Sequence, residues 1–105
     1  MWTRSAFWIG APKAGFEAPF KVGVTDVLVP GLTSLPGVKG VTALWPDRCE
    51  QGAPQIACQI LVQFASMADI DLMLSSQQRQ ALRLEVVKLA EMFDGTISHI
   101  DYHVG

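Results

Sequence analysis

Three residues near the end of the chain carry side chains that could do chemistry: His99, Asp101 and His103 alternate in the segment HIDYHVG. Alternate residues of a strand project from the same face, so all three side chains are expected on one side of a sheet. An aspartate can orient a neighbouring imidazole, whose ordinary pKa of about 6.5 suits general acid or base catalysis at neutral pH. We therefore predict His99, Asp101 and His103 as candidate catalytic residues.

The spacing of these residues argues against a metal ion held by both histidines. A strand rises roughly 3.3 Å per residue, which separates the backbones of His99 and His103 by about 13 Å. Residues two apart lie about 7 Å from each other and could share a ligand or a proton. We expect no metal site. The alternative is that these side chains line a wet interface, hydrogen-bonded to a partner chain or to water.

Length and composition restrict the class of protein. A chain of 105 residues, half of them apolar, is expected to form one compact domain over residues 1–105 with a single core. The eight basic residues are scattered and the net charge is −2, so nucleic acid is not an expected partner. No stretch approaches the roughly 20 apolar residues of a membrane span, and a cytoplasmic protein is expected. Glycine-rich phosphate loops are missing, and we expect no nucleotide cofactor.

Periodicity along the chain predicts six main elements. Apolar and polar residues alternate, or β-formers cluster, in four predicted strands: residues 3–10, 38–45, 55–65 and 96–104. Helical spacing predicts a helix over 19–34, which Pro30 should kink or end. Capping-box patterns at Ser66 and Ser75 introduce two further helical pieces, 67–74 and 77–93, with Asp94 and Gly95 as the stop. The order βαββαβ predicts an α+β protein, a ferredoxin-like sandwich with one antiparallel sheet.

Helices of such a sandwich cover one face of the sheet, and the other face needs a different cover. Alternation places Phe7 and Ile9 on one side of the first strand and Trp8 on the other. We expect the uncovered face to carry Arg4, Trp8, Gln59, Leu61, Gln63, His99, Asp101 and His103, with Trp45. Such a face is too apolar for a free surface, so a second copy of the chain is the simplest cover.

Several of these residues could also form a ligand site. Tryptophan offers a large apolar face with one hydrogen-bond donor, and glutamine amides can orient a ligand. We therefore predict ligand-binding roles for Arg4, Trp8, Trp45, Gln59 and Gln63. Packing is the alternative for the two tryptophans, and hydrogen bonding across an interface is the alternative for the two glutamines.

The chain resembles the EthD-like family of dimeric α+β-barrel proteins. The resemblance rests on Phe20 and Pro30 of the first helix, on the turn Leu35-Pro36-Gly37 into the second strand, and on a serine-led helix after the third strand. It implies a homodimer in which two ferredoxin-like sheets pack face to face as a dimeric α/β barrel. It also implies a link to the degradation of ethers and other small apolar organic compounds. Relatives that oxygenate or isomerise substrates without a bound cofactor suggest such an activity by analogy.

One departure from the family pattern concerns catalysis. Family members often carry histidine-alanine-proline near the end of the first helix, and Leu28-Val29-Pro30 stands at the matching place. The protein would then rely on His99 or His103, bind a small organic molecule without transforming it, or act as a non-catalytic dimeric accessory or interaction module. The sequence leaves these three hypotheses open.

Overall fold

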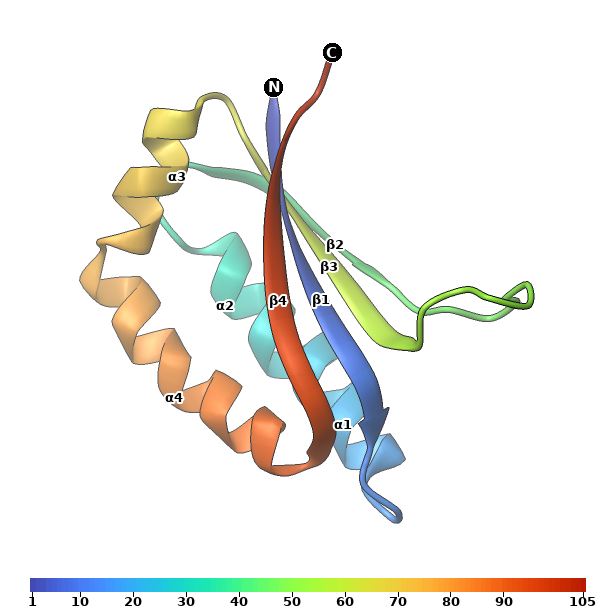
Figure 1. Cartoon of the computed structure of the whole chain (residues 1–105). Coiled ribbons are helices and arrows are strands. Elements are labelled where there is room, and N and C mark those ends of the chain that lie inside the picture. The colour runs from blue at the N-terminus through green and yellow to red at the C-terminus, as the bar shows by residue number, and fades with distance from the viewer.

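The computed structural model describes residues 1–105 and contains one four-stranded sheet with its helices on a single face (Figure 1). The strands are β1 (Trp2–Pro12), β2 (Val38–Leu44), β3 (Ile56–Phe64) and β4 (Phe93–His103). They lie in the order β2-β3-β1-β4, and every neighbouring pair is antiparallel. The predicted ferredoxin-like sandwich is confirmed. No helix combines the length and the apolar character that a membrane span requires.

The first helical segment runs through Pro30 instead of ending there. It consists of α1 (Glu17–Gly23), the π-helical turn η1 (Val24–Leu28) and α2 (Val29–Thr33). The N–H of Val29 donates to the carbonyl of Val24, five residues back. Proline lacks an N–H and clashes with the carbonyl four residues earlier, and a π turn just before it relieves both problems. The predicted kink therefore appears as a wider turn, and the helix continues to Thr33.

The second pair of helices consists of α3 (Met67–Leu74) and α4 (Gln77–Glu91). The hydroxyl of Ser66 accepts a 3.2 Å hydrogen bond from the N–H of Asp69, which confirms the predicted cap of α3. The cap of α4 lies one residue later than predicted, because the hydroxyl of Ser76, and not that of Ser75, accepts from the N–H of Arg79 at 3.1 Å.

The end of α4 also differs from the prediction. The helix ends at Glu91 and β4 begins at Phe93, so Asp94 and Gly95 lie inside the strand and do not form the stop of the helix. Phe93 packs in the core, although it belongs to the strand and not to the helix. The chain therefore changes from helix to strand with a single residue between them.

Aromatic side chains occupy the centre of the core. The Trp8 ring meets Phe20 and Phe93 edge-on, with centroids 5.2 Å away in both cases, and Phe20 stacks on Phe93 at the same distance. Each of the three side chains is at least 94% buried. Edge-to-face and offset pairs are favoured by the ring quadrupole, so this cluster holds β1, α1 and β4 together. The buried side chains of β3 complete the core: Cys58, Ile60, Val62 and Phe64.

The strand register shows that part of the predicted face assignment was wrong. Trp8 lies opposite Cys58 and Arg4 lies opposite Val62, and both partners face the helices. On the other edge of β1, the strand β4 pairs Asp101 with Arg4, His99 with Ala6 and His103 with Trp2. Six residues expected on the uncovered face therefore lie on the helix-covered side of the sheet: Arg4, Trp8, Trp45, His99, Asp101 and His103. The core therefore contains the larger side chain of Trp8 and not that of Phe7.

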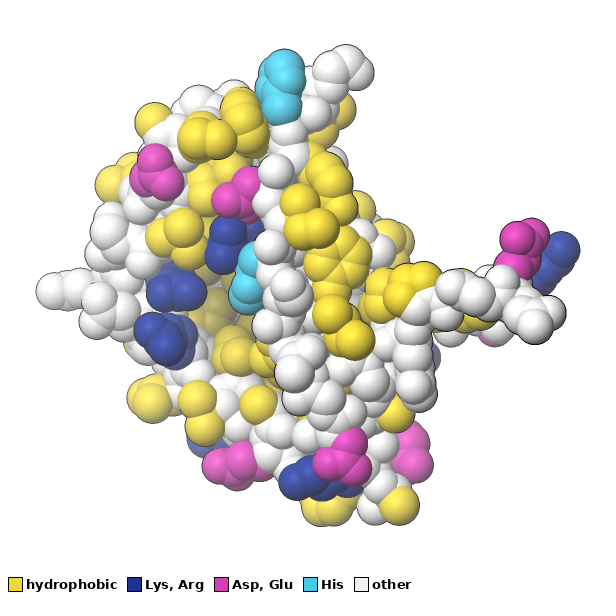
Figure 2. Space-filling view, viewed as in Figure 1, with side chains coloured by type: hydrophobic (Ala, Val, Ile, Leu, Met, Phe, Trp, Pro, Cys, Tyr) yellow, Lys and Arg dark blue, Asp and Glu magenta, His cyan; other side chains and the backbone are white.

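The uncovered face of the sheet has a different composition from the one predicted. Gln59, Leu61 and Gln63 lie there as expected, and they are joined by apolar side chains that alternate with the helix-facing residues. We call the following set the open face: Phe7, Ile9, Gln59, Leu61, Gln63, Ile100 and Tyr102. Ile100 and Tyr102 are 47% and 43% exposed, and Figure 2 shows hydrophobic side chains gathered on this side of β4. The expectation of an apolar uncovered face holds, with more hydrophobic members.

Gly10 of β1 and Gly95 of β4 are paired in the sheet, and we expect that neither position tolerates a side chain. Gly95 has φ of +151°, and a Cβ there would fall on the backbone oxygen of Ile9, which cannot move away as a side chain could. We expect Gly95→Ala to destabilise the protein by at least about 2 kcal/mol more than Gly52→Ala, whose site has φ of +90° and open space around it. Urea unfolding followed by circular dichroism measures both. Equal stabilities of the two variants would contradict the conclusion that the backbone of β1 leaves no room for a side chain at Gly95.

Candidate functional site

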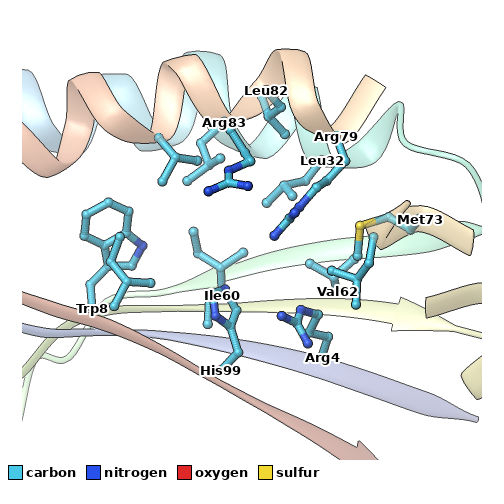
Figure 3. A pocket seen from close by; sticks show the side chains of 15 residues that line it. Arg4, Trp8, Leu32, Ile60, Val62, Met73, Arg79, Leu82, Arg83 and His99 are labelled. Carbon is cyan, nitrogen blue, oxygen red and sulfur yellow. The ribbon is translucent and has the colours of Figure 1, made fainter. Parts of the chain in front are cut away.

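A cavity of about 260 Å³ lies between the helix-facing side of the sheet and the helices (Figure 3). The sheet contributes Arg4, Ala6 and Trp8 from β1, Ile60 and Val62 from β3, and Ile97 and His99 from β4. The helices contribute Leu28 and Leu32 from the first segment, Met73 and Leu74 from α3, and Arg79, Leu82, Arg83 and Val86 from α4. We call this space the central cavity. In Figure 2 it appears as a hollow beside β4, with basic side chains and a histidine around hydrophobic walls.

All the polar residues that line the central cavity are basic. Eleven of its fifteen lining residues are hydrophobic, and the other four are Arg4, Arg79, Arg83 and His99. In Figure 3, Arg79 and Arg83 point from α4 toward the sheet, whereas Arg4 and His99 point from the sheet toward α4. Basic groups therefore enter from both walls of an otherwise apolar space.

Arg4 already has a partner of opposite charge. One terminal nitrogen, Nη1, donates to both carboxylate oxygens of Asp101, at 2.9 and 3.1 Å. The two residues lie directly opposite each other on adjacent strands, a position that favours pairs of opposite charge. No hydrogen bond joins Asp101 to His99. Asp101 therefore holds Arg4, and the predicted aspartate–imidazole pair is not formed.

His99 stands at the mouth of the central cavity with a perturbed acidity. Desolvation by the cavity wall lowers the pKa of His99 below its ordinary value of 6.5, and the positive charges of Arg4 and Arg79 lower it further. The carboxylate of Asp101 acts in the opposite direction but is outweighed. His99 is therefore mainly a neutral imidazole at neutral pH, the form that can accept a proton from a bound molecule.

The other residues that the sequence proposed for a site are dispersed. The ring of His103 lies 5.1 Å from that of Trp2 at the end of the sheet, outside the central cavity. Trp45 lies near Phe20, with the Lys21 ammonium 5.2 Å from its ring, at a shallow hollow on another part of the surface. Trp8 lines the cavity but is 1% exposed, which makes it part of the core as well.

The two predicted glutamines belong to the open face. The amide nitrogen of Gln59 donates to the hydroxyl of the buried Ser5 at 2.9 Å, and Gln63 lies exposed two residues further along β3. Both are separated from the central cavity by the sheet itself. Of the eight residues proposed from the sequence, the structure brings Arg4, Trp8 and His99 together in one cavity, with Asp101 bound to Arg4.

The sequence analysis did not predict Arg79 and Arg83 as site residues, although both line the central cavity. The signal was present in the helical spacing. Arg79 lies three residues before Leu82 and seven before Val86, on the line of the apolar stripe, and Arg83 lies four residues after Arg79. An arginine that continues an apolar stripe is a better candidate for a lined cavity than for solvent. No group of three or more histidine, cysteine or acidic side chains is arranged to hold a metal ion.

These features define an α+β protein with a ferredoxin-like sheet, an amphipathic cavity under the helices and an apolar open face. Many solved structures share the fold, among them three that match along nearly the whole chain. An EthD family protein from Bacillus halodurans matches with a TM-score of 0.80 and 10% identity, covering 100% of this chain and 99% of its own. A DABB family protein with a ferredoxin-like fold from Mesorhizobium loti matches with a TM-score of 0.71 and 14% identity, over 98% and 96%.

The third is a dimeric ferredoxin-like protein of unknown function from Jannaschia sp., with a TM-score of 0.65 and 18% identity over 99% and 100% of the two chains. No protein-family model and no curated protein sequence matches the chain. At these identities the likeness concerns the fold, and it agrees with the EthD-like resemblance seen in the sequence.

The pKa of His99 is expected to follow the charges around it. In Arg4→Met the repelling guanidinium is lost and Asp101 loses its partner, so both changes raise the pKa of His99. Arg79→Gln should also raise it, because it removes a second repelling charge. An NMR titration of the imidazole between about pH 4 and pH 8 measures this. The control is Lys88→Gln, which removes a charge that is exposed and paired with Glu85; a pKa that moves equally in all three variants would contradict the local explanation.

Proposed function

We propose that this protein is a homodimer in which each subunit binds a small organic molecule in its central cavity. The observation that carries the proposal is the cavity itself, which is lined mainly by hydrophobic residues of the sheet and of three helical segments. A hydrophobic cavity of about 150 Å³ accommodates benzene, and drug-sized ligands occupy about 300–1,000 Å³. A space of about 260 Å³ therefore suits a molecule between these two sizes.

His99 is the residue that we propose for any proton transfer in this cavity. It is the one imidazole among the lining residues, and its lowered pKa favours the neutral, proton-accepting form at neutral pH. In this proposal Asp101 acts indirectly, because its carboxylate holds Arg4 in place. His103 has no part in it, since its ring lies beside that of Trp2, outside the cavity.

A non-catalytic binding module is the second candidate, and Leu28 favours it. The EthD-like pattern often has a histidine at this place, and Leu28 is 4% exposed and lines the central cavity. A leucine there adds apolar surface and removes the imidazole that relatives could use. Binding without turnover, in support of a partner enzyme, agrees with that change.

Dimer formation is supported by the open face. Ile9, Ile100 and Tyr102 are each between 39% and 47% exposed on one side of a continuous sheet, and apolar patches of this kind mark interfaces in soluble proteins. The Jannaschia protein with the same fold is described as dimeric. Two open faces packed together would bury these side chains, whereas the central cavities would lie under the helices of their own subunits.

Cavity binding can be tested with a neutral aromatic probe, 2-naphthamide, followed through the tryptophan indole signals in NMR spectra. Only Trp8 of the three tryptophans lines the central cavity, so its signal should move while those of Trp2 and Trp45 stay in place. Ala6→Phe fills the cavity from β1 and Val86→Phe fills it from α4, and both should abolish the shift. Ala90→Phe adds the same ring at an exposed site of α4 and should not. Shifts that persist in both cavity-filling variants would contradict the proposal.

The dimer can be tested by light scattering at micromolar concentration. Ile100→Lys places a charge in the open face and should weaken association by at least about tenfold, since a buried unpaired charge is costly. Val87→Lys makes a similar change at a 54% exposed residue of α4 and should leave the dimer intact. A monomeric wild-type protein would refute the proposed role of the open face.

A further inference from the structure

The central cavity contains an excess of positive charge that the chain itself does not neutralise. All 105 residues are described, and their ion pairs number two: Arg4 with Asp101, and Lys88 with Glu85. Arg79 and Arg83 have no carboxylate within salt-bridge distance, and neither side chain donates a hydrogen bond to another residue. Two guanidinium groups therefore face the cavity without a partner.

Their placement on α4 is unfavourable in the free protein. Arg79 and Arg83 are four residues apart, so two like charges share one face of the helix. Arg79 also lies in the first turn of α4, where the helix dipole favours acidic residues, and that turn contains none. Desolvation lowers the pKa of Arg79, and Arg83 and Arg4 lower it further by repulsion. A negative charge between these groups would relieve each of these costs.

The rest of the cavity restricts which anion can supply that charge. Trp8, Ile60 and Leu82 are among the hydrophobic residues that surround the basic groups, and a small inorganic anion would leave their surfaces without contacts. A neutral apolar molecule would fill the space but leave both guanidinium groups unpaired, which is costly where water is displaced. An apolar body that carries one acidic group satisfies both parts of the cavity.

We propose that the ligand of the central cavity is a small organic carboxylate, whose acidic group is bound by Arg79 and Arg83 and whose apolar body lies against Trp8 and the hydrophobic walls. Figure 3 shows both arginines directed into this space from α4. A guanidinium group has planar, forked donors that match a carboxylate, so the pairing is specific in geometry as well as in charge. This inference rests on the proposed binding function and specifies its ligand class.

The test compares 2-naphthoate with 2-naphthamide, two probes of nearly the same shape that differ in charge. We expect the carboxylate to bind at least about tenfold more tightly to the wild-type protein, by calorimetry and by the shift of the Trp8 indole signal. Arg79→Gln and Arg83→Gln should each remove most of this preference, because each takes away one of the charged donors to the carboxylate of 2-naphthoate. Arg79→Lys should keep part of the preference, since it retains the charge but not the fork.

Two controls separate this inference from a general effect of charge. Lys88→Gln removes an exposed positive charge from the same helix and should change the affinity for 2-naphthoate by less than about twofold. Without ligand, Arg79→Gln should be at least as stable as the wild type, because it relieves the repulsion with Arg83. A marked loss of stability would instead mean that Arg79 has a structural partner, and would count against the proposal.

The possible results distinguish this inference from the proposed function. Equal affinities for the two probes, both lost in Ala6→Phe, would overturn the carboxylate inference and leave cavity binding intact. Failure of both probes to bind would overturn cavity binding and the inference together. Binding of 2-naphthoate that is equally weakened by Lys88→Gln and Arg79→Gln would reduce the effect to surface electrostatics and refute the assigned site.

Discussion

Burial of the Trp8 indole is the constraint on which the rest of this structure depends. The ring is 1% exposed and packs edge-on against Phe20 from the first helix and Phe93 from the start of β4. Because side chains alternate along a strand, fixing Trp8 toward the helices also fixes Arg4 and Ala6 toward them. Pairing with β4 then brings His99 and Asp101 to the same side. The burial of this one aromatic side chain thus determines which residues can line the central cavity.

The alternation of β1 explains how far the sequence could predict the site. The elements and their order were predictable, because β3 alternates apolar and polar residues and α4 has a regular apolar stripe. The sequence could not predict which side of β1 faces the helices, because Phe7 and Ile9 on one side are as apolar as Ala6 and Trp8 on the other. A choice between such faces reverses every side chain of the strand. His99 was therefore assigned to the wrong face of the sheet, and the structure places it among the residues that line the central cavity.

The helical wall of the cavity depends on two structural features that the spacing of apolar residues in the sequence does not predict. The π turn at η1 lets the first helical segment pass Pro30, so that both Leu28 and Leu32 line the cavity. Gly31 allows this segment to approach α4 closely, because a Cβ there would come within 2.5 Å of the Leu82 side chain. Neither feature follows from residue type alone, since each depends on how two helices meet.

The arginines of the central cavity fall into two groups, which differ in whether the chain supplies a partner of opposite charge. Asp101 of the edge strand β4 neutralises Arg4 of the neighbouring β1, and this pair is complete without a ligand. Arg79 and Arg83 lie on the opposite wall, where no acidic residue of the chain reaches them. If stability alone shaped this helix, an acidic or neutral residue in its first turn would suit the dipole better than Arg79 does. The unfavourable placement is therefore better explained by what the cavity holds than by how the chain folds.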